Sequence, residues 1–328
     1  MPDLLHLPMA MAALDRDYLQ RDNPDLFDEL WENPLTRILP VFNGRVLVNE
    51  HEPAASAPHT LKLFEVEQVP SAQLRAYLGR TTPNLFGEDL IFAEPEGSPI
   101  VLAVLSQNSA DQLEPNRDNW REIRRTGRGL AARDANIFAQ ALALANFHAS
   151  HRHCPACGQP TVIQQGGWSR RCFTDDRQVF PRTDPAIIVS VTDEEGRILL
   201  GSQGVWEANR FSVFAGFVEA GESLTAAVSR EVFEEAGVRV SDIHYLGSQA
   251  WPFPNSLMVG FSAKLDPGFG TQIPTPDGDE IEKLQWFTRE EIIAGHRDGS
   301  LMLPGPISIA RALIEHWLGE PLGVSNHD

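Results

Sequence analysis

Glutamates crowd one short stretch of this 328-residue chain. Residues 216–238 read GFVEAGESLTAAVSREVFEEAGV, with five glutamates and one cation, Arg230. Glu231, Glu234 and Glu235 fall within five positions, and no lysine at i+4 relieves their repulsion. Carboxylates gathered on one rigid element supply the hard oxygen ligands that Mg²⁺ or Mn²⁺ prefers. The alternative is an ordinary solvated helix face, as most charge runs are.

Caps and apolar spacing indicate the element that positions these carboxylates. The Ser223 hydroxyl can cap a helix N-terminus, and Gly237 can end the helix in the left-handed conformation. The sequence therefore predicts a helix of about 13 residues, with Glu231 and Glu235 on one face and Glu234 one row over. A second face carries the apolar stripe to be buried: Val228, Val232 and Ala236.

The whole stretch resembles the Nudix box. Gly216, five residues, Glu222, seven residues and then REVFEEAGV from Arg230 match that motif without a departure. The resemblance implies a strand–loop–helix that binds divalent metals and cleaves a nucleoside diphosphate linked to another group. It implies that the three clustered glutamates are metal ligands and that Glu222 pairs with Arg230 to brace the loop against the helix.

A second motif points to one subfamily. Residues 248–256, SQAWPFPNS, are similar to the SQPWPFPxS signature of the NADH pyrophosphatases, with Ala250 in place of proline. By composition alone the same segment would be a structural loop, since its prolines exclude a central strand. The resemblance implies a homodimer that hydrolyses NAD(H) to NMN(H) and AMP with Mg²⁺ or Mn²⁺. In DGDEIEKLQWF it makes Glu280 a further metal or catalytic glutamate, and Glu234 and Glu280 are both candidates for the general base.

The same resemblance assigns the substrate-binding residues. Phe217 is expected to stack on a substrate ring, and Phe180 corresponds to a family tyrosine that reaches the substrate from the partner subunit. Phenylalanine at that position keeps the face for stacking and loses the hydroxyl. The motif at 248–256 adds the remaining candidates: Gln249, Trp251, Phe253 and Ser256.

Three cysteines resemble an incomplete zinc ribbon. Cys154 and Cys157 form a C-x₂-C pair, Cys172 follows, and Asp175 stands where the family pattern has a fourth cysteine. Zinc accepts carboxylate oxygen as well as thiolate, so a Cys₃Asp site is chemically possible. Two other interpretations of this segment stay open. Asp176 or His153 could be the fourth ligand, or packing could hold the ribbon without a metal.

The fold expected is α/β, a Nudix α/β/α sandwich with an N-terminal β-rich α+β domain and a short zinc-ribbon-like insert. We place the N-terminal domain at 1–131, the linking helix and ribbon at 132–179 and the Nudix domain at 180–328. Locally, the sequence predicts a tight turn at 43–44, a short helix at 71–80, a strand at 99–107, one long helix at 132–151 and a hairpin at 186–203.

Composition limits the other possibilities. A net charge of −18 disfavours a general electrostatic grip on nucleic acid. Removal of NAD caps from RNA, with the same chemistry, is nevertheless an alternative if a basic groove forms near Arg170, Arg171 and Arg177. A non-catalytic nucleotide sensor is a further alternative, although the box is intact. The sparse cysteines, and the lack of a signal peptide or transmembrane pattern, predict a cytoplasmic protein.

Overall fold

The computed structural model divides into two compact units, each described here by itself. The N-terminal unit comprises residues 11–183 and 251–255, and the C-terminal unit comprises residues 7–10, 184–250 and 256–323. No helix in the described ranges is long and apolar enough to cross a membrane. The structure describes residues 7–49, 58–82, 84–85, 88–89, 94–126, 129–207 and 209–323.

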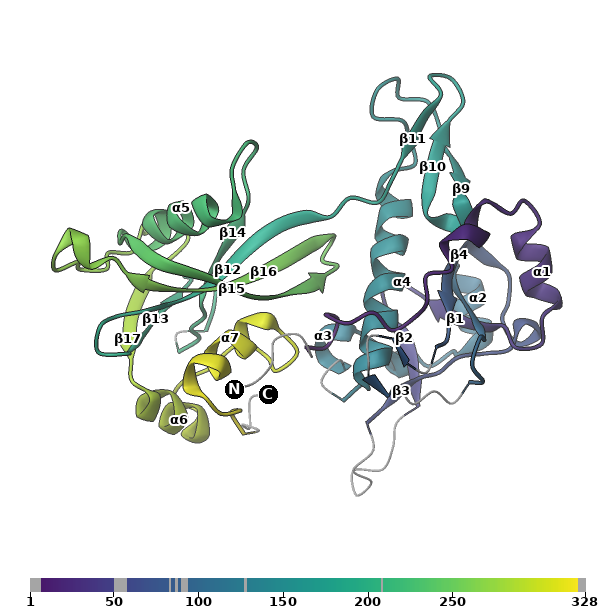
Figure 1. Ribbon diagram of the computed structural model, residues 1–328. Coiled ribbons are helices and arrows are strands. Elements are labelled where there is room, and N and C mark those ends of the chain that lie inside the picture. The colour runs from purple at the N-terminus through teal and green to yellow at the C-terminus, as the bar shows by residue number, and fades with distance from the viewer. Residues whose placement is uncertain are drawn as a thin grey trace. The chain divides into compact units, whose positions relative to one another are not determined.

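A three-stranded sheet forms the centre of the N-terminal unit (Figure 1). β1 (Arg37–Val41) runs parallel to β7 (Pro99–Leu105), which pairs on its other side with the antiparallel β4 (Ala72–Arg80). Two smaller sheets have the orders β3-β2-β8 and β5-β6. The other elements before the ribbon are α1 (Leu26–Glu32), β2 (Val46–Asn49), β3 (Thr60–Leu61), β5 (Asn84–Leu85), β6 (Glu88–Asp89), α2 (Gln107–Leu113), β8 (Trp120–Arg121), α3 (Ile123–Thr126) and α4 (Ala132–Ser150).

The prediction of a helix at residues 71–80 is wrong, because residues 72–80 form the strand β4. Leu74 and Leu78 stand four positions apart, which suits a helix, but Leu74 and Ala76 are buried on either side of the exposed Arg75, the period of a strand. Gly79 adopts φ 132°, and a Cβ there would lie 2.1 Å from the carbonyl oxygen of Asp15. Pairing with β7 and this close backbone approach therefore override the local helix propensity.

The long helix, the strand near 99–107 and the turn at 43–44 are confirmed. α4 covers 132–150 and β7 covers 99–105, while Asn43 and Gly44 both adopt positive φ between the bridged residues Phe42 and Arg45. The Gln140 side chain donates to the Leu78 carbonyl at 2.7 Å, which ties α4 to β4.

A three-stranded antiparallel ribbon follows α4. Its strands are β9 (Val162–Gln164), β10 (Ser169–Cys172) and β11 (Arg177–Val179), in the order β11-β10-β9. It belongs to the N-terminal unit.

In the C-terminal unit, helices cover both faces of a mixed six-stranded sheet. The strand order is β15-β16-β12-β13-β17, and β14 pairs with β12. β12 and β13 are antiparallel, which confirms the predicted hairpin. The elements are β12 (Asp184–Thr192), β13 (Ile198–Ser202), β14 (Phe214–Phe217), α5 (Leu224–Ala236), β15 (Val240–Trp251), β16 (Ser256–Leu265), β17 (Lys283–Phe287), α6 (Arg289–Asp298) and α7 (Ile309–Leu318).

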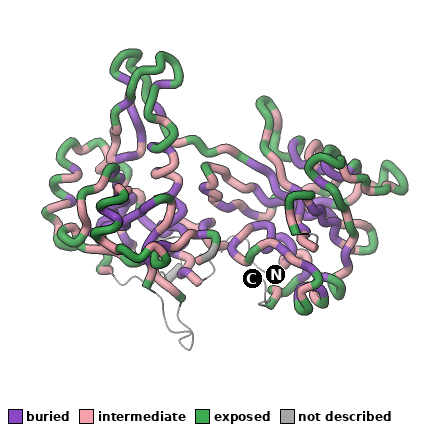
Figure 2. The backbone as a smooth tube through the Cα atoms, turned by 180° about the vertical axis from the view of Figure 1, so that it is seen from behind, coloured by how far each residue is buried: buried purple, intermediate pink, exposed green. Residues whose placement is uncertain are grey.

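Alternation along β12 creates two separate cores. Ile187, Val189 and Val191 pack with Val228 and Val232 of α5, whereas Ile188, between them in sequence, packs with residues of α6 and α7. This is the period of two that a strand covered on both faces requires. Figure 2 shows that burial is concentrated along the strands of each unit and that the connecting loops are mostly exposed. An α/β/α sandwich results, with α5 fixed rigidly on one face.

Candidate active site

The predicted acidic helix is present with its predicted caps. α5 begins after Ser223, whose Oγ accepts a hydrogen bond from the Ala226 N–H at 3.2 Å, and ends at Gly237 with φ 67°. The apolar stripe of Val228, Val232 and Ala236 has no exposed surface. The glutamates therefore lie on the other faces of α5, and the core contacts of the apolar stripe hold this helix in place.

Arg230 gathers the loop and the helix glutamates around one guanidinium. Its Nε and Nη2 donate to the two carboxylate oxygens of Glu222, each at 2.8 Å, and Nη2 also donates to the Phe217 carbonyl at 2.9 Å. Its Nη1 donates to Glu231 at 2.8 Å and to Glu234 at 2.9 Å. The hydrogen bonds to Glu222 are the largest cause that raises the pKa of Arg230 and lowers that of Glu222. The bracing pair that the sequence predicted is thus formed.

Gly216 leaves room for a carboxylate against β14. A Cβ at this position would lie 2.0 Å from Cδ of Glu231, so only glycine accommodates the observed side chain. Burial raises the pKa of Glu231, and the neighbouring Arg230 opposes this shift. The first glycine of the motif is therefore needed for space.

Glu235 is the most buried of the clustered acids, with 4% of its surface exposed. Burial is the largest cause that raises its pKa to about 8, and the negative charges of Glu280, Glu231, Asp277 and Glu234 add to the shift. A carboxyl in this position holds its proton near neutral pH unless a cation approaches. The crowding that the sequence suggested therefore persists in three dimensions.

Asp277 was not singled out from the sequence, although it organises the loop that carries Glu280. Its carboxylate accepts hydrogen bonds from the backbone N–H of Ile281 at 2.8 Å and of Asp279 and Glu280 at 3.3 Å each. These bonds, led by the one from Ile281, lower the pKa of Asp277. The signal in the sequence was Asp277-Gly278, a pair typical of a turn that a side chain caps.

The donor set fits a hard divalent cation. All candidate ligands in this region are carboxylates, and Arg230 is the one cation hydrogen-bonded to them among the described residues. Nη1 of that arginine holds Glu231 and Glu234, so their oxygens are partnered by a guanidinium that a divalent cation would have to replace. Glu231, Glu234, Glu235 and Glu280 would hold the cation once their side chains close on it, since their ligand atoms do not form a described group of three or more within 4.8 Å.

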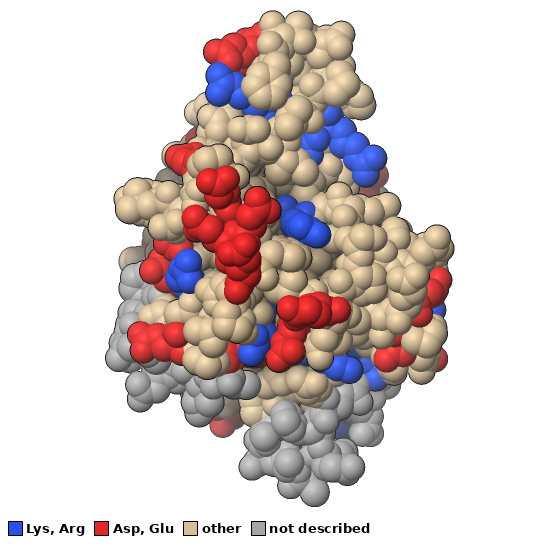
Figure 3. Space-filling view, turned by 90° about the vertical axis from the view of Figure 1, so that its right-hand side faces the viewer, with Lys and Arg blue, Asp and Glu red and all other residues tan. Residues whose placement is uncertain are grey.

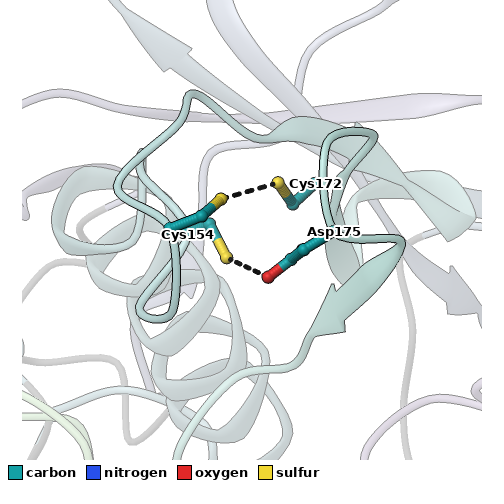
Figure 4. Close-up of side chains that lie close together, drawn as sticks. Cys154, Cys172 and Asp175 are labelled. Carbon is teal, nitrogen blue, oxygen red and sulfur yellow. Dashed lines mark hydrogen bonds between the residues drawn. The ribbon is translucent and has the colours of Figure 1, made fainter.

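A second cluster lies in the ribbon of the N-terminal unit. One ligand atom from each of Cys154, Cys157, Cys172 and Asp175 lies within 4.8 Å of every other, and they are the only such group of three or more in the part of the chain that the structure describes. Cys154 Sγ lies 3.2 Å from Asp175 Oδ2, and Cys157 Sγ lies 3.5 Å from Cys172 Sγ. Figure 4 shows Cys154, Cys172 and Asp175 pointing into the space between the loops that carry them. Ligand atoms around tetrahedral zinc are about 3.8 Å apart, so the four donors fit.

The surroundings of Cys157 and Cys172 shift the pKa values of these two thiols in opposite directions. A backbone hydrogen bond at Gln159 lowers the pKa of Cys157, but burial and the neighbouring thiols outweigh it and raise that pKa to about 11. Backbone hydrogen bonds at Asp175 and Thr174 lower the pKa of Cys172. Binding a cation here would therefore require the loss of protons from thiols, as zinc sites do.

The alternative fourth ligands are placed differently. Asp176 Oδ1 accepts hydrogen bonds from Nε and Nη2 of Arg171, and its side chain is 78% exposed. His153 is exposed and does not belong to the converging group. Asp175 is therefore the fourth donor that the structure brings to the three cysteines.

Three protein-family models match the chain, and two of them span the residues of the acidic region and of the ribbon cluster. A model of the NUDIX domain matches residues 181–303, one of the NADH pyrophosphatase zinc ribbon domain matches 149–180, and one of the NADH pyrophosphatase-like rudimentary NUDIX domain matches 35–146. Residues 181–303 are thus a NUDIX domain. The predicted fold class, a Nudix sandwich with a β-rich N-terminal part and a ribbon, is confirmed.

Curated relatives are similar over the part that holds these domains. The chain is 44% identical over 204 residues to the NAD-capped RNA hydrolase NudC of Mycobacterium tuberculosis (strain H37Rv), which covers 60% of this chain and 64% of that protein. It is 37% identical over 201 residues to the human NAD-capped RNA hydrolase NUDT12, with 58% and 43% covered. The match thus spans less than two thirds of either relative. Among solved structures, a NUDIX hydrolase from Nitrosomonas europaea is 23% identical, with TM-score 0.39 over 53% of this chain and 97% of that one.

In the C-terminal unit of this Nudix chain, the predicted substrate residues have different surroundings. Phe217 is 60% exposed directly after Gly216 and is free to stack. Gln249 is completely buried: its Nε2 donates to the carbonyls of Pro8 and Ile307, and its Oε1 accepts from the Ile309 N–H at 2.9 Å. These contacts favour a positioning role for Gln249. Ser256 opens β16 and pairs in register with Asp184 of β12.

The aromatic part of the SQAWPFPNS motif belongs to the N-terminal unit of the Nudix chain. Trp251 and Phe253 pack edge to face at 5.2 Å, and the Arg124 guanidinium lies 4.0 Å from the Phe253 ring. Nδ2 of Asn146 on α4 donates to the carbonyls of Pro252 and Pro254, each at 3.0 Å. The prolines lie in the turn between β15 and β16, which agrees with their predicted exclusion from a strand. Phe180 is 54% exposed after β11.

Proposed function

We propose that this chain is an NADH pyrophosphatase that hydrolyses the pyrophosphate bond of NAD(H) and releases NMN(H) and AMP. The observation that carries the proposal is the crowding of acids on and beside α5: Glu231, Glu234 and Glu280 act electrostatically on the buried Glu235, and Arg230 is hydrogen-bonded to Glu222. The matched NADH pyrophosphatase domains support the dinucleotide as substrate.

Each residue of the cluster has a separate task in this proposal. Mg²⁺ or Mn²⁺, when bound to the glutamates, would neutralise charge on the pyrophosphate and lower the pKa of a water. Arg230 holds Glu222 and the Phe217 carbonyl, which fixes the loop that presents Gly216. Glu234, whose side chain is 55% exposed, and Glu280, which is also exposed, are the candidates that can accept a proton from the attacking water.

Phe217, Phe180, Trp251, Phe253 and Ser256 are proposed to contact the dinucleotide. Phe217, exposed directly after Gly216, suits the nicotinamide or adenine ring, and stacking of this kind contributes about 1–3 kcal/mol per ring in nucleic-acid systems. Gln249 would act indirectly, by holding β15 against the start of α7. Phe180 would act from the partner subunit of a homodimer, as in the subfamily that the chain resembles.

Removal of NAD caps from RNA is a second candidate. It is favoured by one observation, the names of the curated relatives, which are NAD-capped RNA hydrolases. The charges are less favourable. Arg171 and Arg177 pair with Asp176 and Asp175, and Arg170 is buried, so the three do not form an open basic groove. On the face seen in Figure 3, basic side chains stand in small groups separated by acidic and uncharged ones.

We also propose that the ribbon binds Zn²⁺ through Cys154, Cys157, Cys172 and Asp175. The convergence of four donors and the matched zinc ribbon domain support it. All three cysteines are free thiols, which supports a cytoplasmic location for the protein.

Product analysis tests the proposed activity. The full chain would be given NADH, ADP-ribose and NAD-capped RNA at matched concentrations with Mg²⁺ or Mn²⁺, beside the variant Glu234→Gln. We expect AMP and NMNH from NADH, with turnover lowered by about 10²-fold or more in the variant. Glu290→Gln is the matched control, because Glu290 is an exposed glutamate on α6.

The outcomes separate the candidates. A faster reaction on NAD-capped RNA than on NADH would favour cap removal. Nucleotide binding without turnover in the unaltered chain would identify a sensor, and hydrolysis of ADP-ribose alone would rule out both dinucleotide activities.

A further inference from the structure

A cavity of about 520 Å³ lies within the N-terminal unit. The end of α4, the strands β4 and β7 and the ribbon all contribute to it. Leu74 and Val104 form part of an apolar wall. None of its described lining residues is acidic, and four carry a guanidinium or an imidazole: His148, Arg152, His153 and Arg170.

Arg170 is buried at the edge of this cavity with only uncharged partners. It is 8% exposed. Its Nε donates to Thr161 Oγ1 at 2.7 Å, its Nη2 to the Thr161 carbonyl at 2.8 Å and its Nη1 to Nδ1 of His148 at 3.0 Å. Since His148 Nε2 lies 2.8 Å from the Gly167 carbonyl, this ring is a neutral imidazole that donates there and accepts from Arg170. Three of the five N–H groups of the guanidinium are thus used, and two remain.

The other buried arginines of the described chain have carboxylate partners. Arg133, 5% exposed, pairs with Asp134 and Glu94, and Arg311, 1% exposed, pairs with Glu315 at 2.8 Å. No such partner accompanies Arg170. A buried charge without an opposite charge is strongly unfavourable, so Arg170 differs from the rule that the rest of the molecule follows.

Neighbouring groups increase the imbalance. Arg152 lines the same cavity and adds a second guanidinium. The C-terminus of α4 offers roughly half a negative charge, less than the full positive charges of two guanidiniums. An anion bound in the cavity would balance the positive charges of Arg170 and Arg152.

We propose that this cavity binds the phosphate group of a nucleotide, held by Arg152 and the free N–H groups of Arg170. Guanidinium forks match phosphate oxygens geometrically and remain charged at any physiological pH. The volume lies in the range of roughly 300–1,000 Å³ that small-ligand sites occupy, and the apolar wall can accept a base. The site is independent of the Nudix glutamates and of the reaction proposed for them.

Chemical protection of Arg152 tests the site locally. The full chain, without added divalent cations, would be treated with phenylglyoxal in the presence of AMP, adenosine or an uncapped RNA oligonucleotide, and labelling would be mapped by mass spectrometry. We expect AMP to slow the labelling of Arg152 at least fivefold and adenosine to leave it unchanged. Arg171, which pairs with Asp176 outside the cavity, is the internal control.

AMP binding to two arginine variants tests the site if labelling is slow. Arg152 is exposed, so Arg152→Ala should fold, and it should weaken AMP binding at this site about tenfold, the loss typical of one charged hydrogen bond. Arg171→Ala should leave it unchanged. Protection by the oligonucleotide as well would identify chain phosphates as a source of the same group. Equal protection by adenosine and AMP, or none by either, would overturn the site.

Discussion

Replacing Gly216 with alanine tests how the Nudix site is built. The added Cβ would lie 2.0 Å from Cδ and Oε1 of Glu231 and 2.3 Å from Oε2. Because Cβ atoms essentially never approach a heavy atom within 3.0 Å, the carboxylate must move by at least the difference, 1.0 Å. That movement breaks the 2.8 Å hydrogen bond from Arg230 Nη1 and displaces a proposed metal ligand.

The displaced atoms are the far end of a flexible side chain, so the fold should tolerate the change. We expect the free energy of unfolding to change by less than about 1 kcal/mol, while kcat on NADH falls by about 10²-fold, the loss that a 1 Å misplacement can cause. Steady-state kinetics and urea unfolding measure the two quantities. Gly323→Ala is the control, since nothing lies within 4 Å of a Cβ there. Turnover within threefold of the unaltered chain, or a collapse in stability, would refute this reasoning.

Two further predictions concern the acids of the two clusters. Burial raises the pKa of Glu235 to about 8 from 4.5 in the unfolded chain, so the stability that its protonation contributes is complete below pH 4.5 and is lost as pH rises through 8. Urea unfolding of the metal-free protein should show a decline over that window that Glu235→Gln lacks; parallel curves would contradict it. Asp175→Ala should lower zinc affinity more than about tenfold while Asp175→Cys retains it, as chelator competition would show; unchanged affinity in the alanine variant would exclude Asp175 as a ligand.

The acidic helix could be predicted because its information is local. The Ser223 cap, the Gly237 stop and the apolar stripe all lie within one stretch of 15 residues, and the cap and the core agree with the predicted helix. The pairing of Glu222 with Arg230 also spans only eight positions. Where caps, spacing and motif agree, the sequence is sufficient to place side chains.

Other features depended on distant contacts and were missed or misread. The strand β4 has helix-forming residues, and only its pairing with β7 and the approach of Asp15 to Gly79 decide its conformation. Gln249 lies in a motif that suggests substrate contact, yet its partners Pro8 and Ile307 stand 241 and 58 positions away. No local pattern contains that information.

The hydrogen bonds of Arg230 divide into two kinds, and this division links the fold to the chemistry. Nε and Nη2 form a bidentate pair with Glu222, which is geometrically well defined and anchors the loop. Nη1 carries two N–H groups and donates to both Glu231 and Glu234. A divalent cation that displaced Nη1 from these two carboxylates would not loosen the loop, because Nε and Nη2 of Arg230 would keep Glu222 and the Phe217 carbonyl. One arginine thus braces the loop with one edge of its guanidinium and holds two of the proposed metal ligands with its remaining nitrogen.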